Sequence, residues 1–412
     1  MTDFTTLPSP QRRALELVRE VAHEKQCRPF LVGGPVRDLL LGRHAIDVDL
    51  TLEDGSSTLA RALAKKIDGR VRSFPQFLTY KVTADGMPEI DIATARKERY
   101  RKPGALPTVT AGRLKDDLVR RDFSINAIAM DLNSGSLHDP TGGERDLHDR
   151  VLRVLHDESF ADDPTRIFRA IRLAGRLGFT IEPHTNALMR AALEAGALTH
   201  ISRERIWREL FLAMDEVDAP RILATLLEQG TLEILFGRRH RDETLLARLE
   251  LVNAEVLANP ELDRYVLFTG ALLRGDASPV DLEGSGFSQK RARNVVQIAN
   301  ELPRFSDALA EAESDRQRFR LFRSLSPEML SVIAAHQPHE REHVVRYQEY
   351  EKFKLPLRGN DLELPGGPHV AKALERTREA VFTGEIAADE ARSFAREKAM
   401  QYLSREQPAD PQ

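Results

Sequence analysis

The spacing of apolar residues changes once along this chain, near residue 150, and this change limits the possible folds. Before it, short apolar or alternating segments separated by Gly and Pro predict strands mixed with helices: PFLVGG, AIDVDLTL, TYKVTA, PEIDIATA and NAIAMDL. After residue 155 apolar residues recur every three or four positions, as in DPTRIFRAIRLAGRLGF, which is the spacing of helices with one buried face. We therefore predict an α+β fold: a head with a mixed sheet, followed by helices alone.

The length of 412 residues allows about two to four hydrophobic cores, so several domains are expected. The pattern places a head at 1–152, a helical neck at 153–215, a helical body at 216–320 and a helical tail at 321–412.

Composition excludes several classes of protein. The N-terminal sequence MTDFTTLPSPQRRALELV has no apolar run behind a basic start, and no later stretch is long enough to span a bilayer. The single cysteine, Cys27, cannot form an intrachain disulfide or a cysteine-based metal site, which fits a reducing compartment. We predict a cytoplasmic protein with no membrane partner.

The formal net charge of -4 gives no general argument for nucleic-acid binding. In one local run, Thr94 to Arg121, Lys and Arg outnumber Asp and Glu. Charge alone leaves two interpretations of this run, a polyanion site and a solvated surface.

In RPFLVGGPVRDLLLG a short apolar run ends at Gly33-Gly34, and Pro35 suits the first turn of a helix that reaches about Leu41. Glycines let backbone amides approach a ligand closely, and the free N–H groups at the start of a helix favour a phosphate. Arg37 in the first turn would add positive charge. A tight structural turn with an exposed arginine is the alternative.

The next predicted strand, AIDVDLTL, places Asp47 and Asp49 on one face and its apolar residues on the other. Two adjacent carboxylates repel each other, so a cation would satisfy them best, and their oxygens suit Mg²⁺. With a triphosphate on the glycine turn, such a metal site would activate an attacking hydroxyl and stabilise departing pyrophosphate. Two exposed aspartates on an edge strand are the alternative.

Several fixed spacings in this region match one family at once. The matching residues are Gly33-Gly34-x-Val36-Arg37-Asp38, Leu40-Leu41-Gly42, and Asp47-x-Asp49 with Thr51. This combination resembles the signature of class II tRNA nucleotidyltransferases, which bacterial poly(A) polymerases share. The resemblance implies a polymerase-β-like nucleotidyltransferase head in which Asp47 and Asp49 bind the catalytic metals, while Gly34 and Arg37 contact the incoming nucleotide.

A second match, Arg120-Arg121-Asp122 with Phe123 and Asn126-Ala127, resembles the family pattern that holds the ribose. Asp122 can accept from a sugar hydroxyl, and Arg121 is a planar donor suited to phosphate or ribose oxygens. A surface salt-bridge cluster would explain these residues equally well.

Glu89 and Asp91 share one face of the strand predicted in PEIDIATARKE, and either could complete the metal site. A polar outer face of a half-buried strand is the alternative. The following segment, ARKERYRKPGALPTV, resembles the flexible connection that family members use while switching between nucleotides.

The segment SFADDPTRIFRAIRLAGRLGF resembles the family's nucleotide-selecting motif, usually Glu-Asp-x-x-Arg, with Asp162 in place of the Glu. Cytosine and adenine each present an exocyclic amine beside a ring-nitrogen acceptor, whereas uracil and guanine reverse donor and acceptor. Asp163 would accept from the amine and Arg166 would donate to the ring nitrogen, so that side chains replace a template. Alternatively, Asp163 and Pro164 are simply the N-cap and first position of a helix.

Arg169 and Arg172 continue the helical face that begins at Arg166 and could meet triphosphate or primer phosphates. A solvated basic face is the alternative. Near the end of the chain, the segment from Leu355 to Ala395 resembles the tail of many bacterial tRNA nucleotidyltransferases, which implies tRNA binding there.

The acid pair predicts Mg²⁺-dependent nucleotide chemistry, and the family resemblance implies an enzyme that adds C and A from CTP and ATP to the tRNA 3′ end and releases pyrophosphate, with no obligate protein partner. Asp47 and Asp49 are the predicted catalytic and metal-binding residues. The predicted nucleotide-binding residues are Gly33, Gly34, Arg37, Arg121, Asp122, Asn126, Asp163, Arg166, Arg169 and Arg172. Because the KPGALP loop differs from the familiar CCA-adding form, addition of CC or A alone stays open, as do polyadenylation and a noncatalytic RNA-binding role.

Overall fold

The computed structural model divides the chain into two compact units. Unit 1 comprises Met1–Arg241 and Glu283–Gly286, and unit 2 comprises Asp242–Leu282 and Phe287–Gln412. The structure describes residues 7–43, 47–105, 107–237, 243–275 and 277–406. No helix of these described segments is long and apolar enough to cross a membrane.

Unit 1 begins with a head built on a mixed sheet, as predicted. Its strands lie in the order β3-β4-β5-β2-β1-β8-β9, with β2 parallel to β5 and the other neighbours antiparallel. The strands are β1 (Phe30–Val32), β2 (Val48–Leu52), β3 (Arg70–Phe74), β4 (Thr79–Thr83), β5 (Ile90–Thr94), β8 (Ala129–Asp131) and β9 (Leu137–His138). This order places β2, which carries Asp49, in the middle of the sheet.

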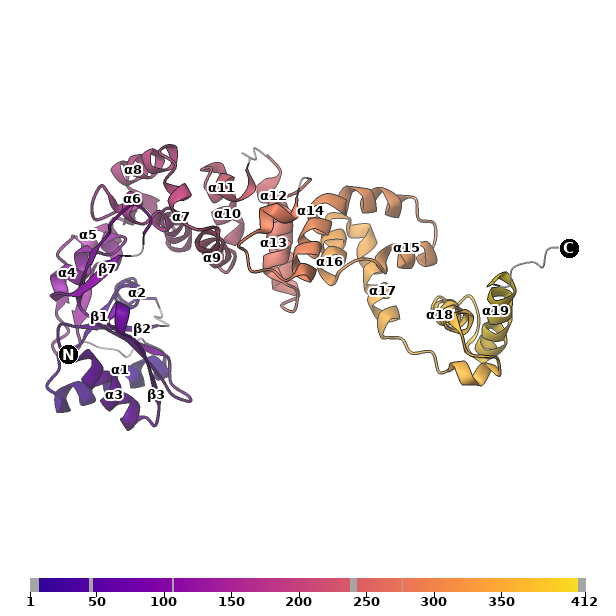
Figure 1. The fold of residues 1–412 in the computed structure, drawn as a ribbon, viewed down its shortest axis with the longest axis horizontal. Helices are drawn as coiled ribbons and strands as arrows, with labels where there is room; N and C mark the ends of the chain where they lie inside the picture. The colour runs from indigo at the N-terminus through magenta and orange to yellow at the C-terminus, as the bar shows by residue number, and fades with distance from the viewer. Residues whose placement is uncertain (1–6, 44–46, 106, 238–242, 276, 407–412) are drawn as a thin grey trace. The chain divides into compact units, whose positions relative to one another are not determined.

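The two faces of the sheet differ because apolar and polar residues alternate along its strands. Val48, Leu50 and Leu52 of β2 are buried, while Asp49 between them is partly exposed. Two helices, α1 (Ser9–Glu24) and α3 (Ser56–Lys66), pack against each other and along one side of the sheet (Figure 1). The face that carries Asp49 is therefore turned away from these helices.

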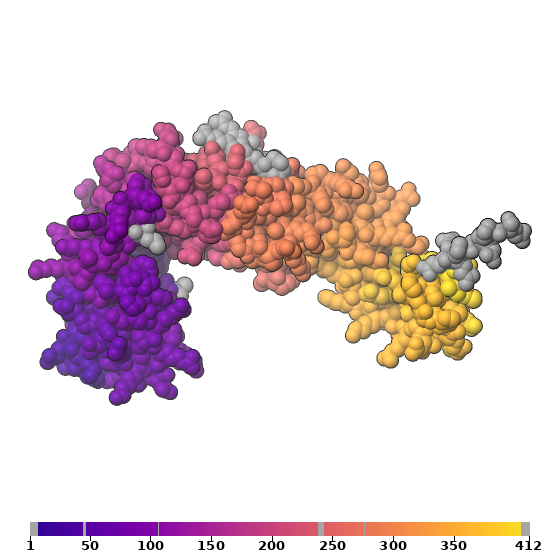
Figure 2. Space-filling model, viewed as in Figure 1, coloured from indigo at the N-terminus to yellow at the C-terminus, as the bar shows by residue number. Residues whose placement is uncertain are grey.

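The remaining helices of unit 1 lie in the head and in the helical region that follows it. They are α2 (Gly34–Leu40), α4 (Leu114–Val119), α5 (Gly143–His148), α6 (Ser159–Asp162), α7 (Thr165–Leu177), α8 (Pro183–Glu194), α9 (Arg203–Met214), α10 (Ala219–Glu228) and α11 (Glu233–Phe236). Helix α7 packs on α9 and α10 and ends at Gly178, whose left-handed φ of 69° suits a helix C-terminus. In the space-filling view, head and neck of unit 1 form one continuous surface, indigo to magenta (Figure 2).

Two short sheets complete unit 1. An antiparallel hairpin joins β6 (Arg96–Arg99) to β7 (Thr108–Ala111) within the predicted basic run. A parallel pair joins β10 (Val151–Leu152) to β11 (Thr180–Ile181), so a two-residue strand interrupts the region that we predicted to be entirely helical.

Unit 2 is helical. Its helices are α12 (Leu245–Ala258), α13 (Arg264–Leu272), α14 (Gln289–Ala310), α15 (Asp315–Phe322), α16 (Pro327–His336), α17 (Arg341–Lys352), α18 (Pro368–Phe382) and α19 (Ala391–Glu406). Helices α18 and α19 form a hairpin in which Ala373, Ala395 and Ala399 are fully buried, because small side chains let two helices approach closely. The α+β class with a helical continuation is thus confirmed, while the predicted division into neck, body and tail stays a prediction.

Candidate active site

A cavity of about 260 Å³ lies between the sheet, α2 and α7 in unit 1. It is lined by Gly34, Pro35, Arg37, Asp38, Asp47, Asp49, Asn126, Arg169, Arg172, Leu173 and Arg176. A hollow of about 870 Å³ lies elsewhere on the head, beside Cys27, Glu53 and His138, and contains none of the predicted site residues. Because carboxylates face arginines in the smaller cavity, it is the stronger candidate for metal-dependent phosphate chemistry.

The turn at Gly33-Gly34 has a backbone conformation that favours glycine. Gly33 caps α2 with φ 74° and ψ -134°, a combination that side chains disfavour. A Cβ at Gly33 would also lie 2.7 Å from Nη1 of Arg121. Gly33 itself does not line the cavity; it brings the Arg121 guanidinium close to the backbone beside Gly34.

Replacing Gly33 with Ala is expected to destabilise unit 1 by about 2 kcal/mol, because the backbone is strained and Arg121 must move. Gly42→Ala is the matched control, since Gly42 has φ 66° but nothing within 4 Å of an added Cβ, and it should cost only about 1 kcal/mol. Thermal or denaturant unfolding of the two variants measures the difference. Equal losses would contradict a steric role for Arg121.

Three aspartates approach one another at the centre of the sheet. Asp47 is exposed and directly precedes β2, Asp49 lies within β2, and Asp91 lies opposite Asp49 on the parallel strand β5. Burial raises the pKa of Asp49 to about 6, with repulsion from Asp91 and Asp47 adding to the effect. Burial likewise raises the pKa of Asp91. The ionised forms of Asp49 and Asp91 are therefore disfavoured when no cation is bound.

These carboxylates fit a divalent cation. Oδ1 of Asp91 is buried and has no hydrogen-bond partner among the described residues, as expected of an oxygen reserved for a ligand. Glu89, the alternative third carboxylate, forms an ion pair with Lys81, which also lies 3.7 Å from Oδ2 of Asp91. Among the described residues, no three or more Cys, His, Asp or Glu side chains are placed to hold a metal together.

A chain of hydrogen bonds joins α2 to α7 beside the aspartates. Arg37 donates from Nη1 to Oδ1 of Asn126 at 2.8 Å, and Nδ2 of Asn126 donates to Oδ1 of Asp122 at 3.0 Å. The other oxygen of Asp122 accepts from Nε and Nη2 of Arg169 at 2.9 and 2.6 Å. Arg37 and Arg169 are thereby held in fixed orientations within the cavity.

The carboxylate of Asp122 is fully engaged in this chain. Its Oδ1 also accepts the backbone N–H of Phe123 at 2.9 Å. Burial would raise the pKa of Asp122, but the charge of Arg169 and the hydrogen bonds from Asn126 and Arg169 outweigh burial and hold that pKa well below its ordinary value. In this conformation Asp122 orients Arg169, and a ribose hydroxyl would have to compete with four donors.

Arg172 enters the cavity from α7 and is braced by the neck. It donates from Nη2 to Glu209 and from Nη1 to Glu216, each at 3.3 Å, while Arg176 donates from Nε to Glu216 at 2.8 Å. Burial raises the pKa of Glu209 although Arg172 opposes the shift. Nε of Arg172 is buried without a hydrogen-bond partner in the described part of the chain, so it is available to an anion.

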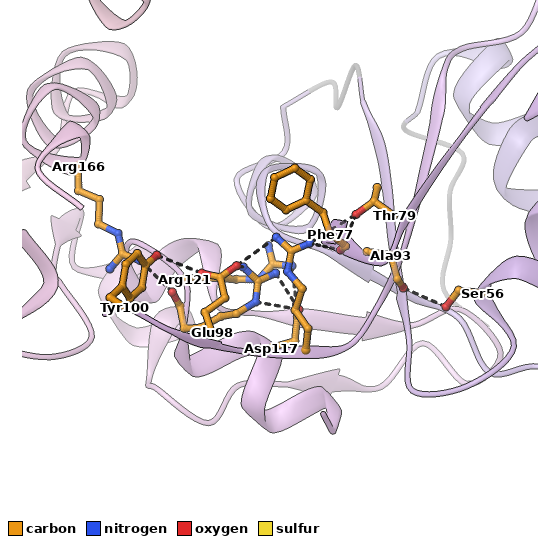
Figure 3. Close-up of polar contacts among 11 residues, drawn as sticks. Ser56, Phe77, Thr79, Ala93, Glu98, Tyr100, Asp117, Arg121 and Arg166 are labelled. Atoms are coloured by element: carbon orange, nitrogen blue, oxygen red, sulfur yellow. Dashed lines mark hydrogen bonds and ion pairs between the residues drawn. The ribbon is translucent and has the colours of Figure 1, made fainter. Parts of the chain in front are cut away.

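A buried ion network ties the β6–β7 hairpin to the head (Figure 3). Asp117 accepts from Arg121 at 2.9 Å and from Arg120 at 2.8 Å, and Arg120 in turn donates to Glu98 of β6 at 2.7 Å. The hydroxyl of Tyr100 donates to Glu98 at 3.1 Å, and burial together with Glu98 raises the pKa of Tyr100 to about 12. Arg121 therefore points between Gly33 and Asp117 and does not line the cavity.

Asp163 and Arg166 lie outside the cavity, where α6 meets α7. Oδ1 of Asp163 accepts from the backbone N–H and the hydroxyl of Thr165, at 3.1 and 2.7 Å, and from Nη2 of Arg205 at 2.9 Å. Asp163 thus supports the start of α7, as the alternative interpretation expected. Its Oδ2, however, accepts no hydrogen bond from the described residues in the structure, so one carboxylate can serve both roles.

Arg166 is almost fully buried. It donates from Nη1 to Ser159 at 2.6 Å and from Nη2 to the carbonyl of Arg120 at 3.0 Å. To contact a base, Arg166 would have to give up its hydrogen bond to Ser159 or to the carbonyl of Arg120.

The structure therefore gathers Gly34, Arg37, Asp47, Asp49, Asn126, Arg169 and Arg172 around one cavity. Asp38 and Arg176 also line it, and we did not predict them from the sequence. Both were within reach of sequence reasoning, because Asp38 follows Arg37 and Arg176 lies one helical turn after Arg172.

Comparisons with known proteins agree with this site. The family model described as "Poly A polymerase head domain" matches residues 29–153, and "Probable RNA and SrmB-binding site of polymerase A" matches residues 178–240. The A-adding tRNA nucleotidyltransferase of Aquifex aeolicus is 34% identical over 345 residues, which cover 80% of this chain and 41% of that protein. The chain spans about half the length of the curated relatives that it matches.

Solved structures match over nearly the whole chain. A tRNA-processing enzyme with CTP is 30% identical, with a TM-score of 0.70, covering 92% of this chain and 100% of the other. The Thermotoga maritima CCA-adding enzyme complexed with tRNA is 26% identical, with a TM-score of 0.77, covering 96% of each chain. By its sequence motifs, its fold and these likenesses, the chain belongs to the class II tRNA nucleotidyltransferase and bacterial poly(A) polymerase family.

Proposed function

We propose that this protein is a Mg²⁺-dependent enzyme that transfers nucleotides from CTP and ATP to the 3′ end of tRNA. The observation that carries the proposal is the cavity in which Asp47 and Asp49 face Arg37, Arg169 and Arg172. Such a site pairs metal-binding carboxylates with cations suited to a triphosphate. The tRNA, ATP and CTP bound in related structures support these substrates.

In this proposal Asp47 and Asp49 would hold the metal together with substrate phosphates, and Asp91 on the neighbouring strand is the candidate for a further ligand. Mg²⁺, when bound, lowers the pKa of the attacking 3′-hydroxyl and neutralises charge on the α-phosphate and the departing pyrophosphate. Arg37 and Arg169 are oriented before the nucleotide arrives, by Asn126 and Asp122, so little entropy is lost on binding. The N–H of Gly34, at the edge of the cavity, would donate to a phosphate oxygen.

Base selection is assigned to Asp163 and Arg166. Oδ2 of Asp163 would accept from the exocyclic amine of cytosine or adenine, while Oδ1 stays with Thr165 and Arg205. A base that presents an oxygen at that position would leave the carboxylate unpaired and repelled, which costs more than a lost hydrogen bond. Arg166 would donate to the ring nitrogen after releasing Ser159 or the Arg120 carbonyl.

Two specificities are candidates within this function. Complete CCA addition is the one that the sequence motifs favour. Addition of A alone is favoured by the likeness to the Aquifex aeolicus A-adding enzyme, which extends over 80% of this chain.

The purified protein should extend tRNA lacking its terminal A when ATP is present. The test uses tRNAs that lack the last three, two or one nucleotides, each incubated with CTP, ATP or both, and Asp49→Asn as the inactive control. Extension of only the tRNA ending in CC identifies A addition, and extension of all three identifies CCA addition. Long A tails on unrelated RNA would identify a polymerase, and inertness on all three tRNAs would leave a noncatalytic RNA-binding role.

A further inference from the structure

A row of charged residues crosses the sheet beside the candidate metal site. Strand pairing places Asp49 of β2 opposite Asp91 of β5, Asp91 opposite Lys81 of β4, and Lys81 opposite Arg72 of β3. Residues directly opposite each other on neighbouring strands project from the same face. The row therefore runs on one face from two carboxylates to two cations.

The cationic end of this row is open to solvent. Arg72 is exposed, and the side chain of Lys81 is 32% exposed. The Arg72 guanidinium lies 5.0 Å from the ring centre of Phe74, which shares its face of β3. Helices α1 and α3 cover the opposite face, so this side of the outer strands is left accessible within unit 1.

The charges of the row are only partly neutralised by the protein. Lys81 pairs with Glu89 and lies 3.7 Å from Asp91. Arg72 forms no ion pair with another described residue, and its guanidinium lies beside the ring of Phe74. A cation held beside an aromatic ring is a common arrangement in surfaces that bind single-stranded RNA.

We propose that Arg72 and Lys81 bind the sugar-phosphate backbone of the RNA acceptor strand just before its 3′-hydroxyl. The inference rests on the proposed function, because the attacking hydroxyl must reach the metal carboxylates. Neighbouring strands are about 4.8 Å apart, so Lys81 lies about one strand spacing and Arg72 about two from Asp91. That span suits the last one or two phosphates of a strand whose end is at Asp49 and Asp91.

The arginines of α7 do not bind the RNA backbone in this proposal. Arg169 and Arg172 lie in the cavity with Asp47 and Asp49, where they suit the triphosphate. The row thereby separates two phosphate sites, the nucleotide on the α7 side of the carboxylates and the primer on the β3 side.

The competing explanation is that basic residues on β3 only protect an edge strand from pairing with other chains. In that case their removal would leave RNA binding unchanged. The primary test variant is Arg72→Met, since Arg72 does not touch the carboxylates, and Arg72→Met/Lys81→Met is the stronger form. The matched control is Arg61→Met/Lys65→Met, which removes the same charge from exposed positions of α3 on the other side of the sheet.

Steady-state kinetics of the full chain with tRNA lacking its terminal A measures the effect. Arg72→Met should raise KM for the RNA about threefold and leave KM for ATP within about twofold, and the double variant should raise KM for the RNA further. Each lost phosphate contact should also reduce the slope of log kcat/KM against log salt concentration by about 1. A KM for RNA and a salt slope equal to those of the control variant would overturn the proposal.

Fluorescence anisotropy with the same RNA separates this inference from the proposed function. If the wild-type chain binds the RNA but transfers no nucleotide, the proposed function fails. The slope of log Kd against log salt concentration still tests whether Arg72 and Lys81 bind the RNA. A shallower slope for Arg72→Met/Lys81→Met than for the control would support it, and equal slopes would refute it.

Discussion

Asp49→Asn is expected to reduce nucleotide transfer on the order of 10³-fold and, in the metal-free protein, to raise the midpoint of thermal unfolding. Transfer falls because the amide has lost the negative charge that holds the cation against the developing charge of the reaction. Stability rises because burial disfavours the charge of the partly buried Asp49 carboxylate and Asp91 and Asp47 repel it, and a neutral amide removes both costs.

The pH dependence of this effect has a definite sign. The pKa of Asp49 is about 6 in the folded chain, against an ordinary value of 3.8, so the folded state binds more protons between these values. The free energy of unfolding of the metal-free wild type therefore decreases as pH rises through this window, by no more than about 3 kcal/mol. Asp49→Asn should lack this decrease.

Single-turnover rates with Mg²⁺ and thermal unfolding in a chelator, each from pH 4 to 8, measure the two effects. Asp54→Asn is the control, because Asp54 is exposed and follows the end of β2. Mg²⁺ should raise the unfolding midpoint of the wild type and of Asp54→Asn, and have little effect on Asp49→Asn. An Asp49→Asn protein that keeps its rate, or that loses stability at neutral pH, would contradict the assignment of the metal site.

Asp163→Asn is expected to shift nucleotide preference away from ATP toward GTP, with the ratio of kcat/KM changing by about 10² to 10⁴. The asparagine oxygen can still accept from Thr165 and Arg205, so the start of α7 is kept. The amide nitrogen Nδ2 then stands where Oδ2 of Asp163 stood. Because Nδ2 is a donor, it repels the adenine amine and can donate to the guanine oxygen.

Asp163→Ala separates the change in nucleotide preference from the loss of the hydrogen bonds that support the start of α7. It removes both functions of the side chain, so it should lose selectivity without gaining a preference for GTP, and lose about 1 kcal/mol of stability with the cap. Competition between ATP and GTP on one tRNA, with unfolding midpoints for both variants, makes the comparison. Unchanged selectivity in a folded Asp163→Asn protein would remove Asp163 from base recognition.

Local patterns were sufficient for those strands whose residues alternate clearly. The five segments that we expected to be strands correspond to β1, β2, β4, β5 and β8. Strand β3, with the sequence RVRSF, was missed because it lies at the edge of the sheet with Arg70, Arg72 and Ser73 exposed. An edge strand buries little, so its sequence carries only a weak alternation signal.

The sequence by itself determined the fold class, the glycine turn before α2, and the pairing of Asp47 with Asp49, because each depends on residues within a few positions of one another. Only the tertiary structure decided which distant groups lie together at the candidate site. The pairing of β2 with β5 brings Asp91, and not Glu89, opposite Asp49. Packing of the helices lets Asp122 accept from Arg169 and one oxygen of Asp163 accept from Arg205. Such partners lie many residues apart in the chain, and their contacts exist only once strands and helices have packed, so no local spacing specifies them.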